Sequence, residues 1–160
     1  MKINIGKTEL IHFVGIGGIG MSGLALIMHS LGFKIQGSDI SDNKNLNLLR
    51  KRKIPIYLKH RSQNIKNCTV LVVSSAIKKS NPEYKHAKKL KLPIYKRGEL
   101  LGHIVSLMKN IVVTGSHGKT TTTSILSNIL NCAKLDPTII NGGVLNSIGS
   151  SAKLGKSDWS

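Results

Sequence analysis

The sequence has 160 residues, 40 % of them hydrophobic, with 24 Lys and Arg against 7 Asp and Glu and a net charge of +17. That length suits one hydrophobic core and part of a second, and it excludes a three-domain enzyme at about 100 to 200 residues per domain. No apolar run approaches the roughly 20 residues of a membrane span, and residues 1–4 lack a signal-peptide pattern, so we expect a cytoplasmic protein without membrane contact.

Short β-branched runs alternate with helical patterns, which is typical of βαβ units around a parallel sheet. In chain order we predict strand 10–14, helix 19–31, strand 33–36, helix 43–53, strand 54–57, strand 69–74, a helix beginning at 81–83, strand 93–95 and helix 99–107. Pro55 favours an edge strand or the start of a strand. The strand at 69–74 is apolar on both faces, which indicates a central, buried position.

Beyond residue 108 the same alternation begins again. We predict strand 110–114, helix 119–131 and strand 137–140, followed by a stretch rich in Gly and Ser up to residue 160. Two glycine-rich loops each open a βα unit, so we predict an α/β protein with two domains. Residues 1–108 would form a Rossmann-like parallel-sheet domain, and residues 109–160 the start of a P-loop-type ATP-binding domain.

The first glycine-rich loop, residues 15–20, fits the pattern GxGxxG between a predicted strand and a predicted helix. In this pattern Gly15 allows a tight turn, Gly17 lets the backbone approach a diphosphate, and Gly20 permits close packing of helix on strand. The helix N-terminus attracts the anion. Asp39, about 20 residues further on, is placed to bind a ribose, or it is a turn or N-cap residue. These features alone would favour an NAD-dependent dehydrogenase.

The second loop, residues 115–121, has the shorter form GxxGK[ST], because Val113 stands where the full P-loop pattern has glycine. In such a loop Lys119 neutralises the β and γ phosphate oxygens, and the Thr120 hydroxyl ligates Mg²⁺. We interpret His117 as a turn or capping residue rather than a catalyst. The predicted ATP-binding residues are Gly115, Ser116, His117, Gly118, Lys119, Thr120 and Thr121.

The cysteines and the excess of positive charge have simpler interpretations. Neither Cys68 nor Cys132 has other ligands at metal-binding spacing, so we expect two reduced thiols. Most Lys and Arg fall on predicted helices, so we interpret them as solvated helix faces and expect no nucleic-acid partner. A basic polyanion-binding surface is the alternative, because nucleic acids are attracted to such charge. The oligomeric state is not predicted.

Taken together, these motifs resemble the Mur ligase family. The resemblance lies in residues 12–25, 37–39, 72–77, 81–83, 115–122 and 141–143, in that order along the chain. It implies that the first domain binds the UDP of a nucleotide sugar instead of NAD. It further implies that Gly15, Gly17 and Gly18 face the diphosphate, and that Asp39, Ser74 and Ser75 lie near the uridine.

The resemblance also implies a reaction. The γ-phosphoryl group of ATP would pass to the lactyl carboxylate of UDP-N-acetylmuramate, and the amine of L-alanine would attack the resulting acyl phosphate. Lys119 and Thr120 with Mg²⁺ would be the catalytic groups on the ATP side. The cofactors expected are therefore ATP and Mg²⁺, and the substrates expected are UDP-N-acetylmuramate and L-alanine.

The sequence departs from the family pattern in two places. Lys59-His60-Arg61 stands where the family has a Gly-His pair, which leaves the role of His60 open. The resemblance also places residue 160 just before an acidic segment with a magnesium-binding glutamate and before a C-terminal ligase domain, so we expect no ligation by this chain alone. A recycling ligase for muramyl tripeptides and a non-catalytic basic fragment are the alternatives.

Overall fold

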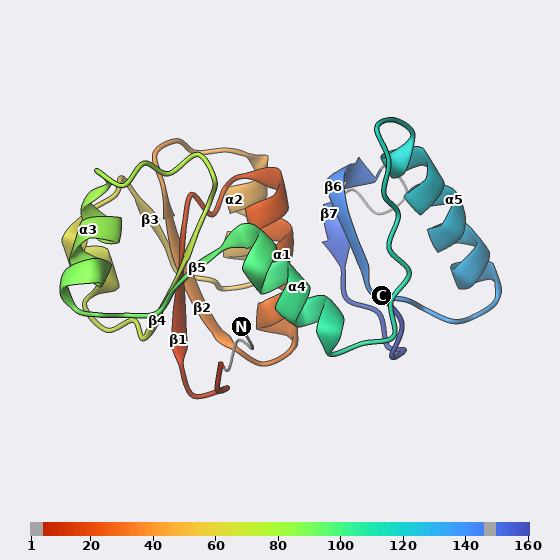
Figure 1. Cartoon of the computed structure of the whole chain (residues 1–160), viewed down its shortest axis with the longest axis horizontal. Coiled ribbons are helices and arrows are strands. Elements are labelled where there is room, and N and C mark those ends of the chain that lie inside the picture. The colour runs from red at the N-terminus through yellow and green to blue at the C-terminus, as the bar shows by residue number, and fades with distance from the viewer. Residues whose placement is uncertain (1–4, 146–149) are drawn as a thin grey trace.

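The computed structural model describes residues 5–145 and 150–160, so residues 1–4 and 146–149, part of the predicted Gly- and Ser-rich stretch, lie outside the described residues. Five parallel strands form one sheet in the order β3-β2-β1-β4-β5 (Figure 1). They are β1 (Leu10–Val14), β2 (Lys34–Asp39), β3 (Ile56–Leu58), β4 (Val70–Val73) and β5 (Ile94–Lys96). The prediction of a parallel α/β sheet is confirmed. Strand β3 begins just after Pro55 and lies at an edge, and β4 lies inside the sheet, as predicted.

Helices cover both faces of this sheet (Figure 1). The helical segments are α1 (Ile19–Ser30), α2 (Lys44–Lys51), η1 (Ser62–Ile65), α3 (Pro82–Lys89) and α4 (Arg97–Ser106). One core contains Leu24 of α1, Leu46 of α2 and Leu100 of α4, packed on one face. A smaller core contains Ile65 of η1 and Ala87 of α3, packed on the other face. Helices on both faces bury the sheet, which explains why its inner strands are apolar throughout.

Polar side chains fix where several helices begin. The Asn43 side chain accepts a hydrogen bond from the Leu46 amide at 3.1 Å, which caps α2. The Asn81 side chain caps α3 in the same way, with Pro82 in the first turn. The Glu99 carboxylate accepts a hydrogen bond from the Lys96 amide at 2.6 Å. This contact lets α4 begin at Arg97, two residues before the predicted start at 99.

The chain beyond α4 forms α5 (Lys119–Cys132) and an antiparallel hairpin of β6 (Ile139–Leu145) and β7 (Ser150–Lys153). The strand β7 was not predicted. The hairpin packs against α1, where the Ser151 hydroxyl donates a hydrogen bond to the Ile19 carbonyl at 2.9 Å. A Cβ atom on Gly23 would lie 2.9 Å from the Ala152 Cβ. A glycine at position 23 therefore lets the hairpin approach the helix closely.

The prediction of a strand at 110–114 is wrong for the described residues. Hydrogen bonds pair Lys109 with Asp158 and Ser160, and the Ile111 amide with the Ser160 carbonyl, but this ladder stops there. Among residues 5–145 and 150–160 no other strand lies beside 112–114, and Val112 is 66 % exposed. A β-branched run becomes a strand only where a neighbouring strand accepts its hydrogen bonds, and here it has a neighbour only at its first residues.

No helix in the described part of the chain is long and apolar enough to cross a membrane. Both cysteines are free thiols, as predicted, with Cys68 buried and Cys132 exposed. Burial raises the pKa of the Cys68 thiol to about 11, which keeps it protonated and unreactive at neutral pH.

Candidate functional site

The first glycine loop lies at the point where the strand order of the sheet reverses, next to β1. Strand β1 pairs with β2 on one side and with β4 on the other, so its carboxyl end opens into the crevice where ligands bind in parallel α/β sheets. Gly15 has φ +78°, and a Cβ atom on it would lie 3.2 Å from the Ser74 Cβ. The fold therefore brings Gly15 and Ser74 together, with Ser75 exposed beside them.

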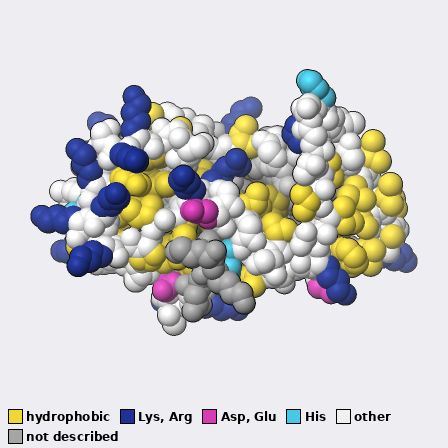
Figure 2. Space-filling view, in the orientation of Figure 1, with side chains coloured by type: hydrophobic (Ala, Val, Ile, Leu, Met, Phe, Trp, Pro, Cys, Tyr) yellow, Lys and Arg dark blue, Asp and Glu magenta, His cyan; other side chains and the backbone are white. Residues whose placement is uncertain are grey.

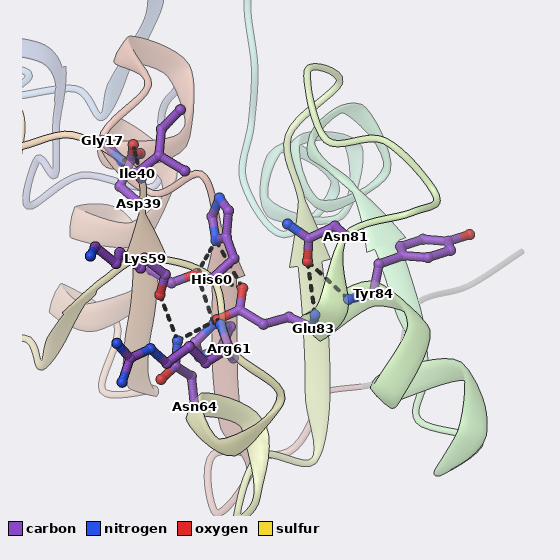
Figure 3. Close-up of polar contacts among 12 residues, drawn as sticks. Gly17, Asp39, Ile40, Lys59, His60, Arg61, Asn64, Asn81, Glu83 and Tyr84 are labelled. Carbon is purple, nitrogen blue, oxygen red and sulfur yellow. Dashed lines mark hydrogen bonds and ion pairs between the residues drawn. The ribbon is translucent and has the colours of Figure 1, made fainter.

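The loop is held by the end of β2. The Ser38 carbonyl accepts hydrogen bonds from the amides of Gly15 at 2.8 Å and Ile16 at 3.0 Å. The Asp39 carboxylate accepts one from the Gly17 amide at 2.8 Å and another from the Ile40 amide, also at 2.8 Å (Figure 3). The buried Asp39 is thus a support for the loop, and its predicted contact with the uridine stays a prediction.

Two glycines of this loop, Gly17 and Gly20, are required by packing within the protein. A Cβ atom on Gly17 would lie 2.7 Å from the Asn43 Nδ2 and 2.9 Å from the Asp39 Oδ2, so glycine is required by protein packing at this position. A Cβ atom on Gly20 would meet the guanidinium of Arg97 instead of a strand. Only Gly18 is exposed with ordinary clearances, the closest being 3.5 Å, at the N-cap of α1.

A buried polar cluster lies behind this loop and was missed by the sequence analysis. Glu83, in the first turn of α3, is fully buried. Its carboxylate accepts hydrogen bonds from the Ser38 hydroxyl and the Asn64 side-chain amide, each at 2.6 Å, and its Oε2 lies 3.1 Å from the Nδ1 of His60 (Figure 3). His60 therefore has a structural position in this chain, although the family's Gly-His pair is altered.

His12 completes the cluster from the middle of β1, where it is fully buried. The Gln36 Nε2 donates to the Asn64 carbonyl at 2.8 Å and lies 3.0 Å from the Nδ1 of His12. That nitrogen of His12 is therefore the acceptor, and Nε2 carries the proton that faces Ser38 and Glu83. Ser38 thus connects the cluster to the loop, because its hydroxyl binds Glu83 and its carbonyl binds the loop amides.

Two opposing effects set the charge state of Glu83. Burial raises the pKa of its carboxyl group, and hydrogen bonds from His12, Ser38 and Asn64 lower it by more, so that the pKa lies below its usual value. The buried side chain is therefore an ionised carboxylate at neutral pH. A histidine inside an apolar strand, and the sequence Asn81-Pro82-Glu83, were the only signals of this cluster in the sequence.

The second glycine loop is exposed at the N-terminus of α5. Gly118 is the N-cap with φ +75°, a left-handed conformation that favours glycine, and its carbonyl accepts the Thr122 amide. The amides of residues 119–121 then have no acceptor within the helix. The Lys119 ammonium group folds back on the loop, where it donates to the carbonyls of Gly115 and, at 2.9 Å, Ser116. The exposed side chains of Ser116, His117 and Thr121 complete the predicted set.

The hairpin of β6 and β7 lies between the two loops. One side of the hairpin contacts α1, the helix that begins at the first glycine loop. On the other side, a Cβ atom on Gly143 would lie 4.0 Å from the Thr120 Oγ1 of the second loop. The described residues contain no group of three or more His, Cys, Asp or Glu side chains that could hold a metal ion. The role of the Thr120 hydroxyl as a Mg²⁺ ligand, which the sequence pattern predicts, stays a prediction.

The basic side chains are dispersed on the face seen in Figure 2, where Lys and Arg stand apart around the rim of the first sheet unit. Among the basic side chains of the described residues, Arg50 forms an ion pair with Asp42 at 2.8 Å. Hydrophobic side chains gather instead over α5, where Ile125 and Ile129 are exposed. The visible face thus has scattered positive charge and a separate apolar area.

Comparisons with known proteins agree with this geometry. The UDP-N-acetylmuramate–L-alanine ligase of Pelagibacter ubique is 67 % identical over 159 residues, which are 99 % of this chain and 34 % of that protein. The crystal structure of the UDP-N-acetylmuramate-alanine ligase of Thermotoga maritima covers 94 % of this chain with 36 % of its own, with a TM-score of 0.87 at 33 % identity. This chain spans about a third of the length of the curated relatives it matches.

A related ligase is almost as similar in structure. The UDP-N-acetylmuramate:L-alanyl-γ-D-glutamyl-meso-diaminopimelate ligase of Neisseria meningitides has a TM-score of 0.86 at 29 % identity and covers 94 % of this chain and 51 % of its own. A family model described as the catalytic domain of Mur ligases matches residues 10–109. With two phosphate-type loops, a parallel sheet and these relatives in agreement, the chain belongs to the Mur ligase family.

Proposed function

We propose that this chain supplies the nucleotide-sugar site and the ATP loop of a ligase that joins L-alanine to UDP-N-acetylmuramate. The observation that carries the proposal is the presence of two glycine loops, each opening a helix, on opposite sides of one hairpin. A dehydrogenase would have no use for the second loop. The proposal includes the division into domains at residues 1–108 and 109–160.

The nucleotide sugar is assigned to the crevice between β1 and β4. Gly18, at the N-cap of α1, offers an exposed helix N-terminus to a diphosphate, and Gly15 and Ser74 form the adjacent wall. Gly17 and Asp39 would support the loop from within the protein, whereas Gly18 would face the ligand. The hydrogen bond between Gly17 and Asp39 keeps the loop in shape, and the Asp39 Oδ2, which among the described residues accepts only the Gly17 amide, keeps a second lone pair for the nucleoside.

The residues of the second loop fit a nucleoside triphosphate with Mg²⁺. The free amides at the start of α5 and the exposed Lys119 suit an anion, and the Thr120 hydroxyl suits a hard cation. ATP would supply the phosphoryl group that turns a carboxylate oxygen into a leaving group, with ADP released. Lys119 would leave its two carbonyl partners and neutralise charge on the phosphoryl oxygens as they transfer.

Binding of UDP-N-acetylmuramate tests the first site. In calorimetry at moderate salt we expect saturable binding by wild type and at least tenfold weaker binding by Gly18→Val. A valine side chain at this exposed N-cap would occupy the space of the diphosphate without meeting a neighbouring atom closer than about 3.5 Å at its Cβ. NAD at the same concentration should not bind.

Gly6→Val is the matched control, because a Cβ atom on Gly6 would also make only an ordinary contact, 3.7 Å from the Thr8 Oγ1. It should bind like wild type. A folded wild-type chain without affinity for the nucleotide sugar would contradict the proposal. Salt-sensitive binding of any polyanion without preference for UDP would instead favour the basic-fragment alternative.

The second site is tested with ATP and Mg²⁺. We expect weak binding by wild type, and a further loss of about ten- to a hundredfold in Lys119→Met, the range expected for a hydrogen bond to a charged group. Lys134→Met removes the same charge at the other end of α5, roughly 20 Å away, and should leave ATP affinity unchanged. Equal affinities of wild type and Lys119→Met, measured with a fluorescent ATP analogue, would exclude a P-loop role for Lys119.

A tripeptide ligase of the recycling type is the second candidate, and the similarity to the Neisseria structure favours it. The sequence identity of 67 % to a relative named for L-alanine favours our first choice. Both activities use the same nucleotide sugar, so the binding tests above apply to either.

A further inference from the structure

Arg97 has an unusual position between the two helices that begin near the first loop. It is the first residue of α4, and its side chain crosses α1 at Gly20. A Cβ atom on Gly20 would lie 2.5 Å from the Nη1 of Arg97 and 3.3 Å from its Cζ. The third glycine of the loop pattern therefore makes room for a guanidinium group, which the sequence analysis did not anticipate.

No anion in the described part of the chain neutralises this group. Arg97 takes part in none of its ion pairs or hydrogen bonds to side chains. The nearest carboxylate in sequence, Glu99, is engaged by the Lys96 amide. The N-termini of α1 and α4 add positive potential at the same place. An exposed cation beside two helix N-termini is an arrangement that an anionic ligand would stabilise.

Asn141, which lines a cavity with Arg97, has an unused side-chain donor. Its Oδ1 accepts a hydrogen bond from the Gly142 amide at 2.9 Å, which fixes the orientation of the side-chain amide. Its Nδ2 is buried and has no partner among the described residues. Because buried donors are almost always satisfied in folded proteins, this atom indicates an acceptor that the protein itself does not supply.

Arg97 and Asn141 line one cavity of about 170 Å³, together with Gly20 of α1 and Ser151 of the hairpin. Gly20 lies two residues after Gly18 of the first loop. Gly143, two residues after Asn141, lies beside Thr120 of the second loop. The cavity is therefore on the path between the two loops, and it is smaller than the roughly 300 Å³ of a site for a whole drug-sized ligand. It suits a single small group such as an oxyanion.

We propose that Arg97 and Asn141 bind the carboxylate of the nucleotide sugar, the group that receives the phosphoryl group. The inference rests on the proposed function. It adds the acyl end of the substrate, because the cavity includes Gly20, two residues after Gly18, and Asn141, two residues before the Gly143 that lies beside Thr120. A guanidinium and an amide N–H are both donors to a carboxylate, and the guanidinium adds the opposite charge.

The test compares two nucleotide sugars, UDP-N-acetylmuramate and UDP-N-acetylglucosamine, which differ by the lactyl ether group that carries the carboxylate. By calorimetry we expect wild type to prefer the acid. Arg97→Gln and Asn141→Asp should each weaken binding of the acid about tenfold and change binding of UDP-N-acetylglucosamine less than twofold. Asn141→Asp keeps an acceptor for the Gly142 amide and replaces the free donor by a negative oxygen, so it tests the donor without disturbing the turn.

Arg52→Gln is the matched control, since it removes the same charge at the end of α2 distant from Asn43. It should leave both affinities unchanged, and all variants should keep the wild-type melting temperature. Equal losses for the two sugars would assign Arg97 to the diphosphate and overturn the proposal, as would unchanged affinity for the acid. A wild-type chain that binds neither sugar would overturn the proposed function itself.

Discussion

Glu83→Ala is expected to lower the free energy of unfolding by about 3 to 5 kcal/mol, because at least two buried donors each lose their acceptor at about 1 to 3 kcal/mol. The fully buried carboxylate accepts hydrogen bonds from Ser38 and Asn64, and the variant leaves these donors unsatisfied in the interior. Urea denaturation followed by circular dichroism measures the change. With a total stability of about 5 to 15 kcal/mol, the variant would unfold at low urea.

Glu99→Ala is the matched control. It also removes a glutamate from the first turn of a helix, but this one is exposed and accepts only the Lys96 amide. We expect a loss of about 1 kcal/mol, the usual effect of a helix cap. Equal effects of the two substitutions would show that the buried cluster contributes no more than a surface cap.

The lowered pKa of Glu83 also predicts the direction of the pH dependence. The folded state holds this proton less tightly than the unfolded chain, in which a glutamate titrates near about 4.3. The stabilisation is therefore complete above that pH and is lost as the pH falls through the lower pKa of the folded state. Glu83→Gln should be less stable than wild type at pH 7 and should lose less stability on acidification. Parallel stability curves from pH 7 to pH 2.5 would contradict this.

Gly37→Ala is expected to destabilise the fold by about 2 to 3 kcal/mol, the upper part of the range for an overpacked core. A Cβ atom at this position in β2 would lie 2.5 Å from the Ile16 Cδ1 and 2.7 Å from the Phe13 carbonyl oxygen. Strand β1 and the first glycine loop must move to accommodate it. The affinity for UDP-N-acetylmuramate should therefore fall together with the stability, and the two measurements are urea denaturation and calorimetry.

Gly102→Ala provides the opposite expectation for the same chemical change. Gly102 lies inside α4, and a Cβ atom on it would have no neighbour within 4 Å. Alanine is the better helix former, so this variant should gain about 0.5 to 1 kcal/mol and bind the nucleotide sugar like wild type. If Gly37→Ala proved as stable as Gly102→Ala, the close contact of β2 with Ile16 would be wrong.

The residues of the first site were only partly predictable from the sequence. The positions of Gly15 and Ser74 follow from strand order, because the carboxyl ends of neighbouring parallel strands lie together. The contact of Asp39 with the Gly17 amide does not follow from any local pattern. A carboxylate after the second strand has the same sequence signature whether it binds a ribose or supports the loop.

By itself the sequence determined the local elements and the two loops of this protein. Alternating β-branched and helical runs, the glycines of the two loops and caps such as Asn43 act over a few residues, so their structures can be predicted from their own segments. The family resemblance carried by those motifs was confirmed by the comparisons.

Only the tertiary structure decided which distant residues meet. Ser38 joins Glu83, 45 residues away, and Arg97 crosses Gly20, although nothing near either residue in the sequence indicates its partner. The segment at 110–114 shows the same limit. Its apolar pattern is strong, but among the described residues only Ser160 pairs with its backbone, at Ile111, and no strand forms. Hydrogen-bond partners and packing across a fold are set by how elements assemble, and that information is spread over the whole chain.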